Sequence, residues 1–203
     1  MFAIVESGSI TSMPRGNKAI QIGDIKYPAT IYTLWSEAER NAIGVYTIEE
    51  DKTNLKDEEW YINTNISYAY DASSNKVKGT YGTATARPIA DVLFTQADED
   101  AGRGTKDELN CRGLKYLKKE IIDGQCAQML APSDWRVVRE QETGDAMDSG
   151  WKTWRASVRT KCNSMQTQID NAANVDALAA LFAYTEQEDK SITRPLGEFP
   201  VKE

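Results

Sequence analysis

The residues that could do chemistry form a limited set, because the chain has no histidine. The sequence therefore lacks the usual general base, the usual zinc ligand and any Ser–His or Cys–His nucleophile pair. Carboxylates alone could hydrolyse a glycosidic bond, but no two of them stand out by their spacing. No glycine-rich phosphate loop is present. We therefore expect a protein that binds rather than catalyses, with no cofactor and no metal.

The three cysteines lie far apart in the sequence, at Cys111, Cys126 and Cys162. Their number is odd and no two of them form a CxxC pair, which argues against a disulfide framework or a metal site. Free cysteine is among the most frequently buried residue types. We expect three buried free thiols in a reducing compartment.

The segment from Leu130 to Arg159 is the centre of the predicted organisation. Pro132 cannot continue a helix that has already begun, so one helix should end at Leu130. Ser133 or Asp134 could then cap a second, short helix. A third helix is predicted after Gly150, because six residues step by three or four along one apolar face. These residues are Trp151, Trp154, Val158, Cys162, Met165 and Ile169.

This segment resembles the C-terminal region of bacteriophage tail assembly chaperones and tail-fibre assembly proteins. The resemblance covers about a third of the chain, and Tyr68–Tyr81 is a second place where the sequence is similar to such proteins. It implies a small β-rich front half and a partner among the tail proteins. The matching positions are Leu130, Pro132, Asp134, Trp135, Val138, Arg139, Glu140, Glu142, Trp151, Trp154, Arg155, Val158 and Arg159.

The tryptophans and arginines of this motif have two possible roles each. Trp135, Trp151 and Trp154 could be contact residues of an interface, but helical spacing favours a place in the core. We expect Asp134 and Arg139 to pair internally near a buried corner, so that Pro132, Asp134, Trp135, Arg139 and Trp154 are structural. Arg155 and Arg159 are separated by one helical turn and, with Trp151, are the candidate partner-binding residues.

Residues 1–95 are predicted to form a β-rich domain with one short helix. Alternating apolar residues and turn signals indicate hairpins at residues 2–13, 19–27 and 60–81. Ser36 and Glu39 match a capping box, and Gly44 fits the position after the helix. The acidic run at residues 49–59 is typical of a solvated loop; a calcium loop is the alternative, although its DxDxDG spacing is absent.

The aromatic residues of the third hairpin could form a platform for a carbohydrate. Packing between neighbouring strands is the alternative, and it is the usual role of aromatic residues in a small sheet. The residues concerned are Trp60, Tyr61, Tyr68, Tyr70 and Tyr81.

The second half is predicted to be helical. Residues 96–104 look like a linker, and a helix capped by Thr105 or Asp107 should run to Leu130. After the third helix, Asn174 or Asp176 could cap a last one, which completes a helical domain at residues 105–185. Residues 186–203 are polar and contain two prolines, so we expect an extended tail that cannot form a core by itself.

The sequence thus predicts an α+β protein. Its net charge is −7, with only a slight basic excess in the middle, so we do not expect nucleic acid as a partner. No apolar run is long enough for a membrane span, and the first residues lack the basic region of a signal peptide.

The resemblance implies a non-enzymatic phage tail-fibre assembly chaperone or adaptor, which could form a homo-oligomer. It would be found in the host cytoplasm during assembly or in the virion tail. A structural component of the tail or baseplate, and a tail-associated enzyme or module for glycans, are the alternatives.

Overall fold

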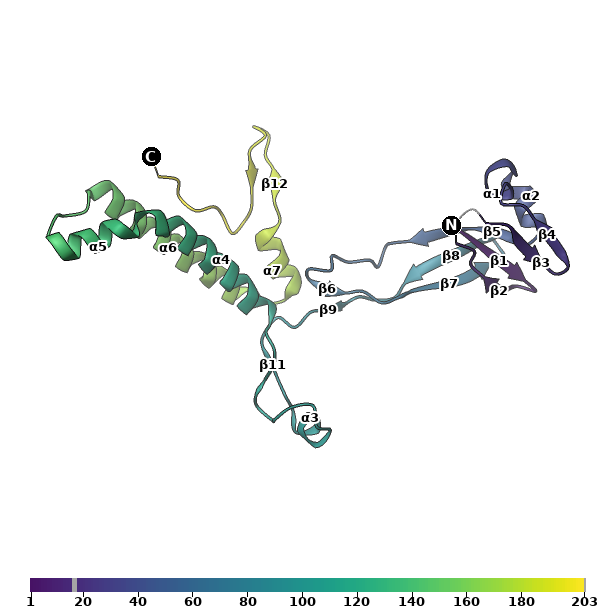
Figure 1. Cartoon of the computed structure of the whole chain (residues 1–203), viewed down its shortest axis with the longest axis horizontal. Coiled ribbons are helices and arrows are strands. Elements are labelled where there is room, and N and C mark those ends of the chain that lie inside the picture. The colour runs from purple at the N-terminus through teal and green to yellow at the C-terminus, as the bar shows by residue number, and fades with distance from the viewer. Residues whose placement is uncertain (16–17, 203) are drawn as a thin grey trace. The chain divides into compact units, whose positions relative to one another are not determined.

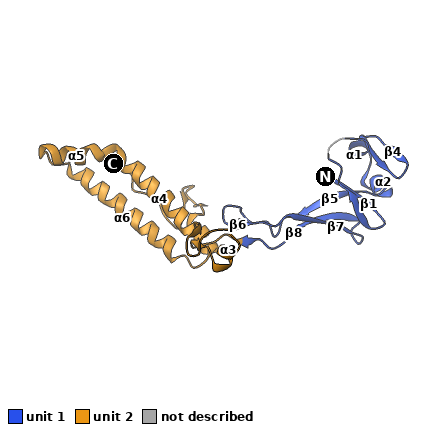
Figure 2. Cartoon of the chain, turned by 60° about the horizontal axis from the view of Figure 1, so that its bottom comes forward, with its two compact units in different colours: residues 1–85 blue, residues 86–203 orange. Residues whose placement is uncertain are grey.

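The computed structural model describes residues 1–15 and 18–202. The protein is α+β, as predicted, and it divides into two compact units at residues 1–85 and 86–203 (Figure 2). The first unit is mostly strands, and the second is mostly helical (Figure 1). The expected boundary at residue 95 was about ten residues too late, because the segment after Thr85 already packs with the second unit.

The first unit is built on a five-stranded sheet in the order β2-β1-β5-β8-β7. All neighbouring strands are antiparallel except β5 and β8, which run parallel. The first and third predicted hairpins are confirmed as β1–β2 and β7–β8. The strands are β1 (Phe2–Glu6), β2 (Ser9–Ser12), β5 (Val45–Asp51), β7 (Ile66–Asp71) and β8 (Lys76–Tyr81).

Both faces of this sheet carry buried residues around β1 and the start of β5, where neighbouring residues of a strand point to opposite sides. On one face Ile4 and Val45 pack against Ile31 and Tyr32 of α1 (Ile31–Leu34). The opposite face forms a second cluster, consisting of Ala3, Val5, Ile48 and Val77 with Ile10, Tyr46, Tyr68 and Tyr70 beside it. The sheet is therefore the common wall of two small cores.

The connection between β2 and β5 supplies the cover for the first of these cores. The predicted hairpin at residues 19–27 is confirmed as β3 (Ile20–Ile22) paired with β4 (Ile25–Tyr27). Helix α2 (Glu37–Ala42) follows, and both hydrogen bonds of the capping box between Ser36 and Glu39 are present. Gly44 has a φ of +80°, and a Cβ there would meet the Val5 carbonyl at 2.7 Å, so this turn requires glycine.

The acidic run at residues 49–59 is only partly the predicted loop. Strand β5 continues to Asp51 because Glu49, Glu50 and Asp51 pair with Lys78, Gly79 and Thr80 of β8. Main-chain pairing with a neighbouring strand thus decided the end of β5, against the acidic composition. Beyond the loop, β6 (Tyr61–Ile62) pairs with β9 (Thr85–Ala86).

The predicted linker at residues 96–104 is instead an ordered excursion of the second unit. Strands β10 (Val92–Leu93) and β11 (Leu109–Cys111) form a hairpin that carries α3 (Gln96–Asp100) at its end. The side chain of Thr95 caps α3 by accepting from the Asp98 amide. The helix expected from Thr105 or Asp107 therefore begins only at Leu114.

Two long antiparallel helices form the body of the second unit, α4 (Leu114–Leu130) and α6 (Ser149–Asn171) (Figure 1). The Lys119 ammonium near the start of α4 lies 2.8 Å from the Asp170 carboxylate at the end of α6. The apolar stripe of the third predicted helix is confirmed, since Val158, Met165 and Ile169 of α6 have no exposed surface. Asp148, which the sequence reasoning did not single out, caps α6.

The corner between the two long helices is made by a 3-10 turn at Ala131–Ser133 and by α5 (Asp134–Thr143). Pro132 lies in the first turn of this 3-10 segment, where its missing N–H has no cost. The expected cap was wrong in detail, because no Ser133 or Asp134 side chain caps α5. The Ser133 hydroxyl donates instead to the Leu130 carbonyl at 2.8 Å.

The C-terminal segment is packed rather than merely extended. Helix α7 (Val175–Phe182) is capped by Asn174, which is one of the two residues predicted for this role. The short hairpin of β12 (Thr185–Glu186) and β13 (Ile192–Thr193) follows it. Leu196 is completely buried, and its amide donates to the Leu181 carbonyl at 3.0 Å. The tail thus adds a residue to the helical core, which the polar composition did not indicate.

Candidate functional site

Arg155 of α6 occupies the centre of the helix corner. This residue is only 5% exposed, and its guanidinium donates to the Leu130 carbonyl at 2.9 Å and to the Ser133 hydroxyl. It also forms an ion pair with the Asp134 carboxylate at 2.6 Å. A planar guanidinium can serve several acceptors at once because its donors point in fixed, different directions. Arg155 therefore holds the end of α4 and the start of α5 together.

This arrangement corrects two expectations about charged residues. Asp134 pairs with Arg155 rather than with Arg139, and Arg139 pairs with Asp145 at 2.9 Å. Arg155 is buried and engaged, so it is not available for a partner. Arg159, one turn further along α6, lies beyond this corner and is exposed. Of the two arginines, only Arg159 remains a candidate contact residue.

The exposed part of the motif lies on α5. We call Trp135, Arg136, Val137 and Val138 the α5 surface. Trp135 and Val138 are each 52% exposed, so Trp135 does not belong to the core as its spacing suggested. The Arg136 guanidinium lies 4.5 Å from the centre of the Trp135 ring and 4.7 Å from that of Trp151. A cation between two aromatic rings is attracted by both of them.

Arg136 was missed by the sequence reasoning. Its position between Trp135 and Trp151 depends on the way α5 folds back beside the start of α6, and sequence spacing contains no signal for that. Trp151 is half-buried and packs edge-to-face on Trp154, with 5.6 Å between the ring centres. Trp151 thus connects the α5 surface to the structural part of the motif.

Trp154, which was predicted to be structural, makes a contact that the sequence did not indicate. Its indole N–H donates to the Pro200 carbonyl at 3.0 Å. The Lys161 ammonium, two turns further along α6, donates to the Leu196 carbonyl at 2.8 Å. Helix α6 therefore fixes the C-terminal segment through side chains that reach its main-chain oxygens.

Two of the three cysteines are buried thiols, as expected. Cys126 and Cys162 lie in the core of the helical unit, whereas Cys111 is exposed on β11. Burial, helped by the nearby Cys126, raises the pKa of Cys162 to about 12. Its thiol is therefore protonated at neutral pH and is a poor nucleophile.

Two of the five aromatic residues of the third hairpin, Trp60 and Tyr70, are engaged in packing. Trp60 is only 6% exposed, so it offers no open face for a sugar. Tyr46 and Tyr70 pack on one another across the sheet, with 4.8 Å between their ring centres. These contacts match the packing alternative.

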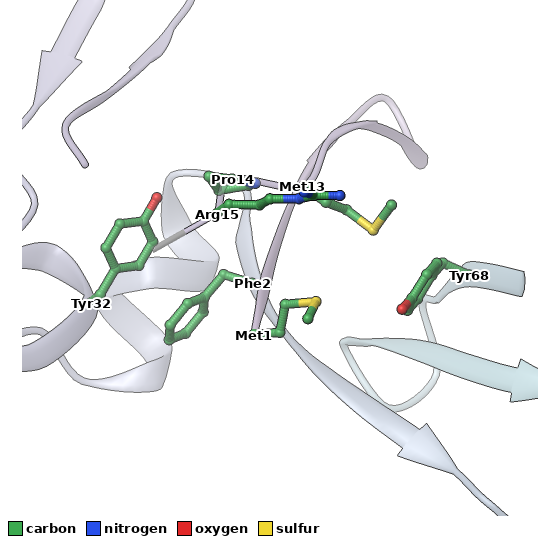
Figure 3. A pocket seen from close by; sticks show the side chains of 7 residues that line it. All are labelled: Met1, Phe2, Met13, Pro14, Arg15, Tyr32 and Tyr68. Atoms are coloured by element: carbon green, nitrogen blue, oxygen red, sulfur yellow. The ribbon is translucent and has the colours of Figure 1, made fainter. Parts of the chain in front are cut away.

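A cavity of about 590 Å³ opens beside this sheet. Figure 3 shows the side chains that line it, with the Tyr32 and Phe2 rings at one end and Tyr68 at the other. The centres of the Phe2 and Tyr32 rings are 4.9 Å apart. Among the described residues, the lining consists of Met1, Phe2, Met13, Pro14, Arg15, Tyr32 and Tyr68.

Neither a metal site nor a membrane span is found within residues 1–15 and 18–202. No three His, Cys, Asp or Glu side chains of these residues gather as metal ligands would. None of their helices combines the length and apolar character that crossing a bilayer requires. Comparisons with protein-family models, curated proteins and solved structures found no match.

Proposed function

We propose that the chain is a non-enzymatic bacteriophage tail protein, an assembly chaperone or adaptor that binds a tail fibre or another tail protein. The proposal rests on the resemblance of the segment from Leu130 to Arg159. The observation that supports it best is the α5 surface, because apolar residues of this motif are exposed to solvent. Exposed tryptophan with arginine beside it is the composition typical of interface hot spots.

The α5 surface suits a partner that presents apolar side chains together with an acidic group. Trp135 and Val138 are three positions apart and lie on the same side of α5. Arg136 has no carboxylate within ion-pair distance among the described residues, so its charge is available to such a group. In a chaperone, this surface would cover apolar parts of the fibre protein until the fibre assembles.

The test is co-expression with the adjacent fibre gene, followed by a pull-down. The parent should retain the fibre protein, and the double variant Trp135→Ser with Val138→Ser should lose it. Leu34→Ser is the matched control, because Leu34 is 77% exposed on the other unit. If the double variant binds the fibre protein as the parent does, the α5 surface is not the contact.

Counting copies in purified virions distinguishes the proposed assembly role from a structural one. An assembly chaperone should be absent from mature particles, because it leaves when the fibre is complete. A structural component of the tail or baseplate would be present at a copy number that matches the symmetry of the tail.

A further inference from the structure

The Tyr32 hydroxyl is a buried polar group without a hydrogen-bond partner among the described residues. The tyrosine is 9% exposed, and burial raises the pKa of its hydroxyl, which is therefore protonated at neutral pH and can donate. Leaving such a group unpaired costs free energy, so buried polar atoms nearly always have partners. Figure 3 shows this hydroxyl pointing toward the Pro14–Arg15 segment of the cavity wall.

The described part of the cavity lining carries positive charge. Among the described residues, Arg15 is the only charged side chain of the lining, and the Arg40 guanidinium lies 5.1 Å from the centre of the Phe2 ring. Neither arginine has a carboxylate within ion-pair distance among the described residues. The cavity therefore favours an anion over a cation.

The remaining walls are apolar and adaptable. Phe2 and Pro14 give the cavity fixed surfaces, while Met1 and Met13 have unbranched side chains that can adjust to differently shaped groups. The volume is within the usual range for sites that bind small molecules or single side chains.

We propose that this cavity binds an apolar group that carries a carboxylate. The apolar part would lie against Phe2 and the two methionines. The carboxylate would accept a hydrogen bond from the Tyr32 hydroxyl and would lie beside the Arg15 guanidinium. This site is separate from the α5 surface, and it would exist whether or not the chain binds a tail fibre.

An apolar carboxylate could come from the terminal residue of a peptide or from a free fatty acid. N-acetyl-phenylalanine represents the first source and octanoate the second. Both can be titrated into the isotope-labelled full chain while amide shifts are followed by NMR. The amides of Phe2, Met13, Arg15 and Tyr32 should shift together, and the probe that binds more tightly identifies the source.

Three results would overturn the proposal in this titration. The first is the absence of a common set of shifts at these amides with either probe. The second is a set of shifts confined to other parts of the chain. The third is equal affinity for the uncharged amide of N-acetyl-phenylalanine, because the arginine would then make no distinction between an anion and a neutral group.

The variant Tyr32→Phe removes only the unpaired hydroxyl and keeps the ring. It should weaken binding of the better probe by about threefold to tenfold, the usual range for one hydrogen bond. It should also unfold at a higher denaturant concentration than the parent, because an unpaired buried hydroxyl is gone. Tyr184→Phe is the control, since this exposed tyrosine belongs to the other unit. An unchanged affinity in Tyr32→Phe would refute the role of the hydroxyl and, with it, the site.

The variant Arg15→Gln tests the charge. Affinity for the carboxylate should fall by about twofold to fivefold, the effect of losing one exposed ion pair. The affinity of the variant should also depend less on salt concentration than that of the parent. Lys26→Gln removes the same charge from the exposed strand β4 and should leave binding unchanged. If the two variants reduce affinity equally, the effect is one of net charge and the proposed contact with Arg15 is wrong.

Discussion

Replacing Arg155 by methionine should destabilise the helical unit by about 2–4 kcal/mol. Methionine keeps most of the apolar stem, so the loss comes from the polar contacts. Each hydrogen bond from a charged donor contributes about 1.5–3 kcal/mol, and Arg155 makes two of them at the buried corner. The Ser133 hydroxyl still donates to the Leu130 carbonyl in the variant, which lowers the expected total.

The ion pair with Asp134 should contribute little to this total. The Asp134 side chain is 58% exposed, and exposed pairs are worth at most about 1 kcal/mol. Asp134→Asn should therefore cost less than about 1 kcal/mol. Arg155→Lys should cost about 1–2 kcal/mol, between the losses expected for Asp134→Asn and for Arg155→Met. The reason is that an ammonium cannot serve separate acceptors as a guanidinium does.

The assay is denaturant unfolding followed by tryptophan fluorescence. Three of the five tryptophans, Trp135, Trp151 and Trp154, belong to the helical unit, so the signal reports mainly on that unit. Arg159→Met is the matched control, because this exposed arginine is one turn further along α6 and should change stability by less than about 0.5 kcal/mol. If Arg155→Met unfolds as the parent does but loses the fibre protein, Arg155 contacts the partner and its assignment to the corner is wrong.

Three further predictions concern the C-terminal segment and α3. Leu196→Ala should destabilise the helical unit by about 2–5 kcal/mol, as at other fully buried leucines, and an unchanged unfolding midpoint would show that the tail does not belong to the core. Trp154→Phe removes the indole donor to Pro200 and should cost about 0.5–1.5 kcal/mol, with loss of amide-exchange protection in the tail as a second readout. Hydrogen bonds from Thr95, then the Arg103 guanidinium, lower the pKa of Asp98 to about 2. Because the pKa of Asp98 is lower in the folded than in the unfolded state, the ionised carboxylate stabilises α3. This stabilisation is complete above about pH 4 and is lost as the pH falls through about 2. An NMR titration of Asp98 with a midpoint near pH 4 would contradict it.

The sequence by itself determined the elements that depend on near neighbours. The hairpins β1–β2, β3–β4 and β7–β8 follow from turn residues and alternating side chains. The cap of α2 follows from the three-residue spacing between Ser36 and Glu39. The buried stripe of α6 follows from helical periodicity, because residues three or four apart share a face whatever lies opposite.

Only the tertiary structure decided the roles that depend on distant residues. Arg155 and Arg159 look alike in the sequence, and the corner between α4 and α5 buries the first and leaves the second exposed. Leu196 stands in a polar segment, and it is buried where that segment contacts α6 and α7. The Tyr32 hydroxyl, which has no hydrogen-bond partner among the described residues, points toward the segment that follows β2. In each case the deciding neighbour is at least 15 residues away, and burial is a property of three-dimensional packing that local spacing does not contain.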